Sequence, residues 1–541
     1  MKQFSVFPIL FLSVALFAQE KKFTLNDTLR GTITPERAWW DLNYYHLSVN
    51  PKPETQFISG RVEIRYTVLS SNQSMQIDLQ PLLHIDKITQ DENELTFNKK
   101  GSNAYFIQLK KPQAKGNKEA VVVYYSGNPI VAKHPPWEGG VQWEKDNNGN
   151  WFIATSCQGL GSSAWWPCKD HMYDEPDSML ISITTPKNLM DVSNGRLRST
   201  VDNADDTKTW NWEVKNPINN YGVNMNIANY VHFADTLHGA KGVLDMNYYV
   251  LPYNLDKAKE QFKQAKLMMK AFEYWFGPYP FYEDGFKLVE VPYLGMEHQS
   301  SVTYGNGYGN GYRGHDLSGT GWGLKWDFII IHESGHEWFA NNITYKDIAD
   351  MWIHESFTNY SEALYTEYYF GKDAATEYVV GTRRGIRNDK PIIGVYNVNE
   401  EGSGDMYPKG GNMLHTIRHS INDDKLFREI LRGLNKTFYH QTVTTQQIEN
   451  FISEKSKMNF SKVFDQYLRN TQIPTLEYYT EKGKIFFRWT NCVNGFDLSI
   501  ILKDGSRINP TEKWQSQKLI EPIDTAYIEK MFYVKTSLKG K

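Results

Sequence analysis

The chain has 541 residues, of which 40% are hydrophobic and 14% are aromatic. Such a composition excludes a largely disordered protein, and the length is enough for several packed domains. The formal net charge of -3 leaves no dominant basic surface, so neither a nucleic-acid partner nor an anionic membrane partner is expected.

The first residues have the pattern of a secretory signal peptide. Lys2 precedes an apolar run from Phe4 to Phe17, and Ala18 is followed by polar residues. The run is shorter than the roughly 20 residues of a membrane-spanning helix. We therefore expect residues 1–18 to be removed and the mature chain to be exported, to a periplasm or outside the cell. No later run is apolar enough to predict a membrane span.

The three cysteines are too few for a disulfide framework. Cys157 and Cys168 either pair in an oxidising compartment or remain small buried thiols, and the sequence leaves both possibilities open.

Strand patterns dominate residues 19–235. Apolar residues at 62, 64, 66 and 68 alternate with polar ones, which predicts a half-buried strand. Residues 118–125 predict another strand, which ends at a Ser-Gly-Asn-Pro turn. We expect this region to form an N-terminal β domain.

Helical patterns begin near residue 254. Asn254 is placed to cap a helix whose apolar residues recur every three or four positions as far as Phe276, and Gly277-Pro278 ends it. That apolar face is expected to lie in a protein core. Further helices are predicted over 325–341, 355–370, 410–421 and 459–470. These patterns predict a mostly helical domain over residues 236–471.

The last 70 residues, 472–541, return to strand patterns. Two apolar runs, 485–489 and 496–501, flank an Asn-Gly turn, which favours a hairpin in a small C-terminal β domain. Earlier in the chain, the low-complexity segment 304–312 reads Y-G-N-G-Y-G-N-G-Y. It is either a flexible linker or an active-site loop.

The strongest chemical pattern is His332-Glu333-Ser334-Gly335-His336. Two histidines four residues apart lie on one face of a helix, where both imidazoles can reach one zinc ion. The carboxylate of Glu333 can then face water on that ion and act as general base. Because this pattern also occurs by chance, a third ligand decides its meaning. Glu355 follows His336 after a gap of 18 residues, enough for a second, antiparallel helix to present its carboxylate to the same ion.

Two histidines and one carboxylate leave a position open, as in catalytic zinc sites. His354, next to Glu355, is expected to be a neighbour rather than a ligand. Glu362 lies seven residues after Glu355 on the same helical face. It is either an orienting partner of one histidine or a solvated surface charge.

This spacing, with the glutamate inside a W-x-x-E sequence, resembles the gluzincin aminopeptidases of peptidase family M1, the aminopeptidase N type. Gly295-Met296-Glu297-His298-Gln299 is similar to the family's G-x-M-E-N strand. The resemblance assigns Glu297 to the free α-ammonium of the substrate, and Gly295 and Met296 to backbone pairing with it. His298 replaces the usual asparagine.

Two further segments carry the resemblance. Cys157-Gln158-Gly159, followed by a W-W-P-C-K-D sequence, is similar to a family segment whose first Gln or Glu is the second amine ligand, which makes Gln158 the candidate. Gln158 as a surface turn residue is the alternative. Tyr407, in Y-P-K-G-G-N-M-L, matches Y-x-K-G-x-x-x-L, where the tyrosine hydroxyl stabilises an oxyanion. Ser356 stands where many relatives have glycine.

The resemblance implies a multi-domain α+β fold. It consists of a saddle-like N-terminal β-sheet domain, a thermolysin-like, mostly helical catalytic domain and a small C-terminal β domain without the large helical domain of many relatives. It also implies a one-zinc aminopeptidase acting on peptides with a free N-terminus. The alternatives are a zinc endopeptidase of the thermolysin type and a non-catalytic zinc-containing binding module. Side-chain preference, natural substrate and oligomeric state are not predicted.

Overall fold

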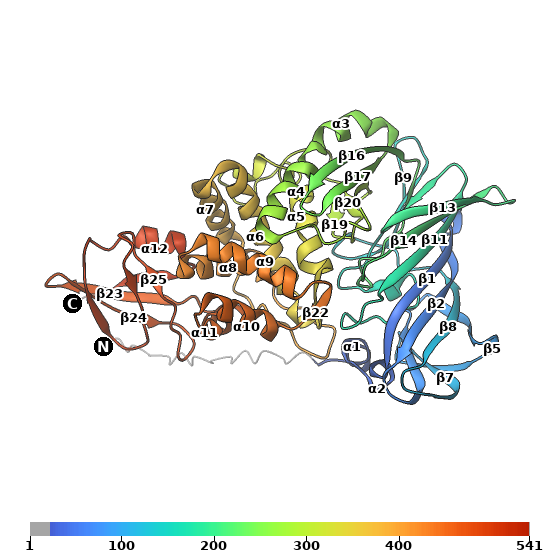
Figure 1. Cartoon of the computed structure of the whole chain (residues 1–541), viewed down its shortest axis with the longest axis horizontal. Coiled ribbons are helices and arrows are strands. Elements are labelled where there is room, and N and C mark those ends of the chain that lie inside the picture. Colours follow the sequence, from blue (N-terminus) through green and yellow to red (C-terminus); the bar gives the residue numbers. More distant parts are fainter. Residues whose placement is uncertain (1–21, 540–541) are drawn as a thin grey trace, which may run out of the picture.

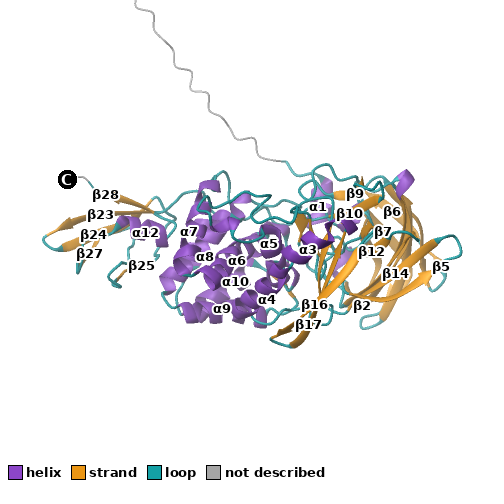
Figure 2. Ribbon diagram, turned by 90° about the horizontal axis from the view of Figure 1, so that it is seen from above, coloured by secondary structure: helices purple, strands orange, loops and turns teal. Residues whose placement is uncertain are grey.

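The computed structural model describes residues 22–539, so the predicted signal peptide lies outside the described residues. Figures 1 and 2 show an elongated molecule in which a β region, a helical region and a second β region follow one another along the long axis. The predicted multi-domain α+β fold class is confirmed. No helix among residues 22–539 has the length and apolar character needed to cross a bilayer.

An eight-stranded sheet forms most of the N-terminal region. On the predicted strand 61–68, Val62, Ile64 and Tyr66 are fully buried while the residues between them face outward, as the alternation predicts. The strand order is β13 (Arg196–Asp202), β14 (Thr207–Val214), β11 (Ser178–Pro186), β1 (Trp40–Lys52), β2 (Phe57–Val68), β8 (Lys118–Gly127), β4 (Leu83–Gln90) and β5 (Asn93–Glu94).

Two smaller sheets and two short helices complete this region. Strand β10 matters most, because it ends immediately before the segment that carries Gln158. The sheets are β12 (Met190–Val192), β15 (Asn226–Ala228), β10 (Trp151–Ser156) and β9 (Gly140–Lys145), and β3 (Asn72–Asp78), β7 (Ala104–Gln113) and β6 (Thr96–Lys100). The helices are α1 (Leu25–Gly31) and α2 (Pro35–Ala38).

The middle region places helices against a five-stranded sheet whose last strand, β19, is an edge strand. The sheet order is β16 (Val231–Gly239), β17 (Gly242–Val250), β18 (Phe286–Glu290), β20 (Val302–Tyr304) and β19 (Gly295–Met296). The helices are α3 (Leu255–Gln261), α4 (Lys263–Phe276), α5 (Phe328–Gly335), α6 (Trp352–Phe370), α7 (Lys372–Gly381), α8 (Pro408–Ile421), α9 (Asp424–Thr437), α10 (Thr445–Ser456) and α11 (Ser461–Leu468). A two-stranded sheet pairs β21 (Ile343–Tyr345) with β22 (Gln441–Val443).

Two predictions about these helices are corrected. The helix expected over 254–276 is divided at Phe262, and the Asn254 side chain makes no cap, because its amide donates to the Glu290 carboxylate at 2.6 Å. The helix expected over 325–341 ends as an α-helix at Gly335 and continues as a π-helical turn with non-helical backbone at Phe339 and Ala340.

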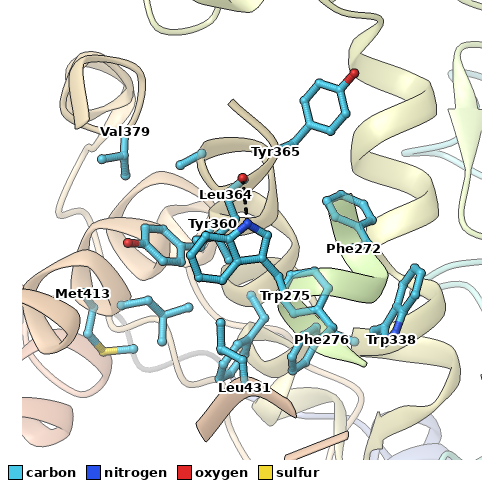
Figure 3. Packing of buried hydrophobic residues seen from close by; sticks show 14 of the residues in the cluster. Phe272, Trp275, Phe276, Trp338, Tyr360, Leu364, Tyr365, Val379, Met413 and Leu431 are labelled. Atoms are coloured by element: carbon cyan, nitrogen blue, oxygen red, sulfur yellow. Dashed lines mark hydrogen bonds between the residues drawn. The ribbon is translucent and has the colours of Figure 1, made fainter. Parts of the chain in front are cut away.

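Aromatic side chains hold α4 against α6 and the π-helical turn. Figure 3 shows four of these side chains close to one another: Phe272, Trp275, Phe276 and Trp338. The Trp275 indole N–H donates to the Leu364 carbonyl at 3.0 Å. All four are at least 96% buried. The predicted core assignment of the 258–276 apolar face is therefore confirmed. This core holds α6, which carries Glu355, and the turn that follows α5.

The C-terminal region shares the core of the helical region. Its sheet has the order β27 (Gln515–Lys518), β24 (Lys484–Thr490), β23 (Thr475–Glu481) and β28 (Lys535–Leu538), beside a pair formed by β25 (Ile500–Ile501) and β26 (Arg507–Ile508), and α12 (Thr525–Met531) packs on α7 and α8. The hairpin expected across the Asn-Gly turn is wrong. Phe496 and Leu498 are buried in this core. Because of this burial, β25 lies away from β24 and pairs with β26 instead.

Candidate metal centre and substrate cavity

A buried N-cap fixes the start of the helix with the two histidines. The Asp327 carboxylate accepts the N–H groups of Ile329 and Ile330 at 3.1 and 3.4 Å. Tyr304, at the end of β20, donates its hydroxyl to the same carboxylate at 2.7 Å. The low-complexity segment 304–312 is thus tied to helix α5 by its first residue, and its last residue, Tyr312, lines the cavity described below.

His332, His336 and Glu355 converge as the sequence predicts. The Nε2 atoms of His332 and His336 lie 3.8 and 3.4 Å from Glu355 Oε2, and the three ligand atoms all lie within 4.8 Å of one another. Helix α6 supplies Glu355 from its first turn, beside α5. The predicted three-residue group is therefore assembled. His354 is not part of it, because its Nε2 accepts the Tyr345 N–H at 2.9 Å.

The donor set fits a divalent cation. Glu355 Oε2 is buried and has no hydrogen-bond partner. The Nδ1 atoms of both histidines are already engaged, by the Glu362 carboxylate at 2.7 Å and by the Phe339 carbonyl at 3.0 Å, so both Nε2 atoms are left to face Glu355. A buried carboxylate oxygen and two imidazole nitrogens around one point are the ligands of a catalytic zinc site.

Glu362 was open between two interpretations, and its environment excludes a solvated surface charge. Its side chain is fully buried. Besides His332, it accepts the Tyr378 hydroxyl at 2.5 Å and the Asn359 amide at 3.3 Å. A carboxylate held in this way fixes the ring of a ligating histidine and raises its basicity.

Negative charge accumulates around the two histidines. The carboxylates of Glu297, Glu333, Glu355 and Glu362 are all at least 90% buried, and none forms an ion pair with a Lys or Arg among residues 22–539. Burial raises the pKa of Glu333 to about 7 and that of Glu297 above its ordinary value. Burial also acts on Glu355, but the neighbouring His336 holds its pKa below the usual range. Such a cluster is stabilised by a cation.

Gln158 and Glu297 lie side by side at one edge of the metal group. The Gln158 amide donates to Glu297 Oε1 at 2.6 Å and to Glu355 Oε1 at 2.9 Å. Gln158 is half-buried in the turn after β10, and it meets Glu297 although the two residues belong to the N-terminal and the middle region. Glu297 is 2% exposed, and its ligand atom groups with those of Glu333 and His336.

Gly295 and Met296 form the free edge of the five-stranded sheet. Gly295 has φ +153°, and an added Cβ would lie 2.6 Å from an Ile329 methyl group on α5. The glycine therefore lets this strand lie directly against helix α5, with its outer edge available for another extended chain.

These residues line one cavity of about 880 Å³. All nine predicted site residues contribute to it: Gln158, Gly295, Met296, Glu297, His332, Glu333, His336, Glu355 and Tyr407. A second cavity of about 690 Å³ adjoins it and shares Trp137, Gln158 and Tyr407. Residues that sequence reasoning missed include Asn359, Arg384 and Arg387, whose only sequence signal is their polarity.

Two family models match the chain. The peptidase family M1 domain matches residues 253–467, and the peptidase M1 N-terminal domain matches residues 42–221. The chain belongs to peptidase family M1.

Similarity to individual members of the M1 family is distant. The chain is 19% identical to "Probable aminopeptidase 1" of Sulfurisphaera tokodaii over 63% of its own length and 44% of the relative's. It is 21% identical to "Endoplasmic reticulum aminopeptidase 1" of Mus musculus over 61% and 36%. The chain therefore spans less than half the length of these curated relatives.

Solved M1 structures share the fold along most of the chain. An M1 zinc metallopeptidase of Deinococcus radiodurans, solved as a variant with a Tyr-Ser-Ala substrate, has a TM-score of 0.67 at 17% identity and covers 82% of this chain and 97% of its own. A two-domain M1 zinc metallopeptidase with L-tryptophan has a TM-score of 0.65 at 17% identity and covers 80% and 96%.

Two departures from the M1 pattern have local explanations. His298, in place of asparagine, is fully buried and shares a hydrogen bond of 3.2 Å with Thr303, while the Glu297 carbonyl is bound by Asn341 at 2.9 Å. Ser356, in place of glycine, donates its hydroxyl to the Met406 carbonyl at 2.7 Å. The serine thus fixes the residue that precedes Tyr407.

Tyr407 lines the same cavity as the edge strand of this M1 site. It occupies the position before α8, and its ring centre is 6.0 Å from that of His332 with the planes 24° apart. Burial raises the pKa of Tyr407, so its hydroxyl stays protonated as a hydrogen-bond donor.

Proposed function

We propose that this chain is a zinc-dependent aminopeptidase that hydrolyses the first peptide bond of peptides with a free N-terminus. One observation carries the proposal: the buried Glu297 carboxylate lies beside the metal group in the same cavity and has Gln158, but no Lys or Arg of residues 22–539, as its partner. A buried carboxylate in that position is matched by an ammonium group of the substrate.

Zinc is the metal that two imidazoles and one carboxylate favour, and His332, His336 and Glu355 would hold it. When bound, zinc polarises the scissile carbonyl and lowers the pKa of water. The protein supplies the remaining chemistry. Glu333 accepts the proton of the attacking water and delivers it to the leaving amine. The Tyr407 hydroxyl donates to the oxygen on which negative charge develops.

The remaining residues orient the substrate. Glu297 accepts hydrogen bonds from the α-ammonium, and the Gln158 amide, which donates to Glu297, presents its carbonyl oxygen as a second acceptor. The free edge of Gly295–Met296 pairs with the substrate backbone. The chain end is thereby fixed so that the first peptide bond is the one beside the metal.

The two alternative functions are less well supported. A thermolysin-type endopeptidase needs room for substrate residues before the scissile bond, where Glu297 and Gln158 stand. A non-catalytic binding module has no use for Glu333, whose side chain makes no hydrogen bond with residues 22–539 and is only 9% exposed. Burial of a carboxylate without a structural partner is costly and is typical of a catalytic group.

An amino-acid anilide and its N-acetylated form test the proposal. The zinc-loaded enzyme should cleave the free form at least about 100-fold faster, since acetylation removes the charge that pairs with Glu297. A chelator should abolish activity and added zinc should restore it. Glu297→Gln should reduce this preference, and Glu333→Gln should abolish turnover while zinc remains bound. Equal cleavage of both anilides would support an endopeptidase, and full activity of the Glu333 variant would contradict the assigned general base.

We also propose that the enzyme is exported, to a periplasm or outside the cell. The pattern of residues 1–18 supports this proposal. Expression of the full chain followed by cell fractionation and N-terminal sequencing tests it, because an exported product begins near residue 19. A product that stays in the cytoplasm with its first residues intact would contradict it.

A further inference from the structure

We propose that Arg384 and Arg387 bind the C-terminal carboxylate of the substrate, so that the preferred substrates are short peptides whose two charged ends both lie in this cavity. The inference rests on the proposed aminopeptidase function. It adds an anion subsite formed by the segment after α7, to which no role has been given above.

The cavity has a direction. Gln158 and Glu297 lie at the His336 side, where the ligand atoms of Glu297, Glu333 and His336 group together. The His332 ring stacks on Phe328, with ring centres 4.9 Å apart. A peptide whose ammonium lies at Glu297 therefore extends past the metal group toward Phe328.

The arginines lie beyond that point. Tyr312 packs against Phe328, with ring centres 5.2 Å apart, and Leu317 follows on the same loop as a lining residue. Arg384 Nε donates to the Leu317 carbonyl at 3.0 Å, which holds its guanidinium at this wall of the cavity. The arginines thus face the part of the substrate that leaves with the new amine.

Neither guanidinium group has an acidic partner among residues 22–539. Arg384 donates only to backbone carbonyls, those of Leu317 and of Asp316 at 2.5 Å, and the Arg387 side chain makes no hydrogen bond or ion pair with residues 22–539. The neighbouring Arg383 differs, since it bonds Asn412 at 2.6 Å and the carbonyls of Glu529 and Lys530. Arg383 therefore has a structural role, while Arg384 and Arg387 have guanidinium N–H groups that make no hydrogen bond with residues 22–539.

Charge is consequently divided along one cavity. Buried carboxylates surround one end, and two guanidinium groups without an acidic partner among residues 22–539 line the other. A peptide with a free amine and a free carboxylate is the ligand that matches both ends. Planar guanidinium groups bind carboxylates through paired hydrogen bonds, which favours this anion over a dispersed negative charge.

Peptides of two to five residues, each as the free acid and as the C-terminal amide, test the inference. For the wild-type enzyme, the ratio of kcat/KM between acid and amide should reach about tenfold at one length, as for a charge-assisted hydrogen bond at a partly solvated site. That peptide length gives the separation between the residues that bind the amine and the arginines that bind the carboxylate. The ratio should fall as salt is raised, because both arginines are exposed.

Variants of Arg384 and Arg387 test whether these two residues cause the preference for the acid over the amide. Arg387→Gln should bring the acid-to-amide ratio down several-fold, and the double variant with Arg384→Gln should bring it to about one. Since Arg384 also holds the Asp316–Leu317 backbone, the single Arg387 variant keeps the test independent of a folding defect. Lys390→Gln removes an exposed cation from the same segment outside the cavity and should leave the ratio unchanged.

An aminoacyl anilide, which carries no carboxylate, separates the two levels of the hypothesis. If the enzyme does not cleave the anilide, the proposed function fails. If it cleaves the anilide normally but treats acids and amides equally at every length, the aminopeptidase proposal stands and the carboxylate site is refuted. A ratio that Arg387→Gln and the double variant leave intact would also refute it.

Discussion

Replacing Glu362 by glutamine should weaken zinc binding about 10- to 100-fold, the usual effect of removing a hydrogen-bonded partner of a ligating histidine. The Glu362 oxygen lies 2.7 Å from His332 Nδ1, and the carboxylate is completely buried. Glutamine keeps an oxygen acceptor for the histidine, removes the charge, and places an NH2 group where the Tyr378 hydroxyl now donates. The expected loss corresponds to about 1.4–2.7 kcal/mol of binding free energy.

Competition between metal-free protein and a chromophoric chelator measures the zinc dissociation constants. At a fixed excess of zinc, the variant should also lose about the same free energy of metal-linked stabilisation, visible as a smaller zinc-dependent rise in Tm. Tyr378→Phe removes the hydroxyl that donates to the other carboxylate oxygen at 2.5 Å and should have a smaller effect in the same direction. Glu429→Gln, at an exposed site on α9, is the control.

The expected order of zinc affinity is wild type and the Glu429 variant first, then Tyr378→Phe, then Glu362→Gln. A folded Glu362 variant that binds zinc within about threefold of wild type would show that His332 is oriented by its packing alone. The stacking of Phe328 on His332 would then be the relevant contact.

Three further outcomes follow from the site and the N-terminal region. Tyr407→Phe should lower kcat about 100- to 1,000-fold with little change in KM, measured with an anilide substrate, and a change confined to KM would contradict an oxyanion role. Ser356→Ala, which removes the bond to the Met406 carbonyl, should lower kcat by less than Tyr407→Phe, and its crystal structure should show Tyr407 displaced. Burial and the charge of Arg37 lower the pKa of His171 to about 3, so the unfolded state binds more protons between pH 6.5 and 3, and stability falls as the pH falls through that window. Denaturant unfolding between pH 7 and 5 should show that the free energy of unfolding of His171→Asn falls less steeply with falling pH than that of the wild type, by up to about 1.4 kcal/mol per pH unit. Parallel plots of this free energy against pH for the two proteins would refute the reasoning.

The candidate metal ligands could be predicted because their geometry is local. Two histidines four residues apart share a helix face whatever the rest of the fold, and a gap of 18 residues is compatible with a second helix beside the first. The alternation of Val62, Ile64 and Tyr66 is equally local. In each case the period of the sequence determines which side chains share a face.

Other features depend on contacts between distant segments. Gln158 meets Glu297 across 139 positions, and no periodicity connects them. Arg384 and Arg387 look like solvated charges in a polar segment until the fold places them in the cavity. The C-terminal hairpin was mispredicted because its Asn-Gly turn is followed by Phe496 and Leu498, whose burial outweighs the local turn preference.

Cys157 and Cys168 show a third limit, since their sequence allowed both a disulfide and two thiols. In the structure both are buried free thiols, and burial raises the pKa of each. Buried thiols with a raised pKa react slowly, so neither is expected to act as a nucleophile. The positions of the two cysteines in the fold determine that they remain thiols, and their spacing of eleven residues in the sequence does not.

The proposed selection of a chain end depends on the contact between two separate cores. The core of the N-terminal region includes Met296 on the edge strand, whereas Leu294, two residues earlier, belongs to the core of the helical region. The strand that precedes Glu297 is therefore held from both sides, and Gln158 approaches Glu297 from the N-terminal side. Helices α5 and α6 supply the three candidate metal ligands. In the proposed function, restricting hydrolysis to the first peptide bond requires that the two cores meet, because their junction positions the Glu297 carboxylate that we propose binds the substrate's amine.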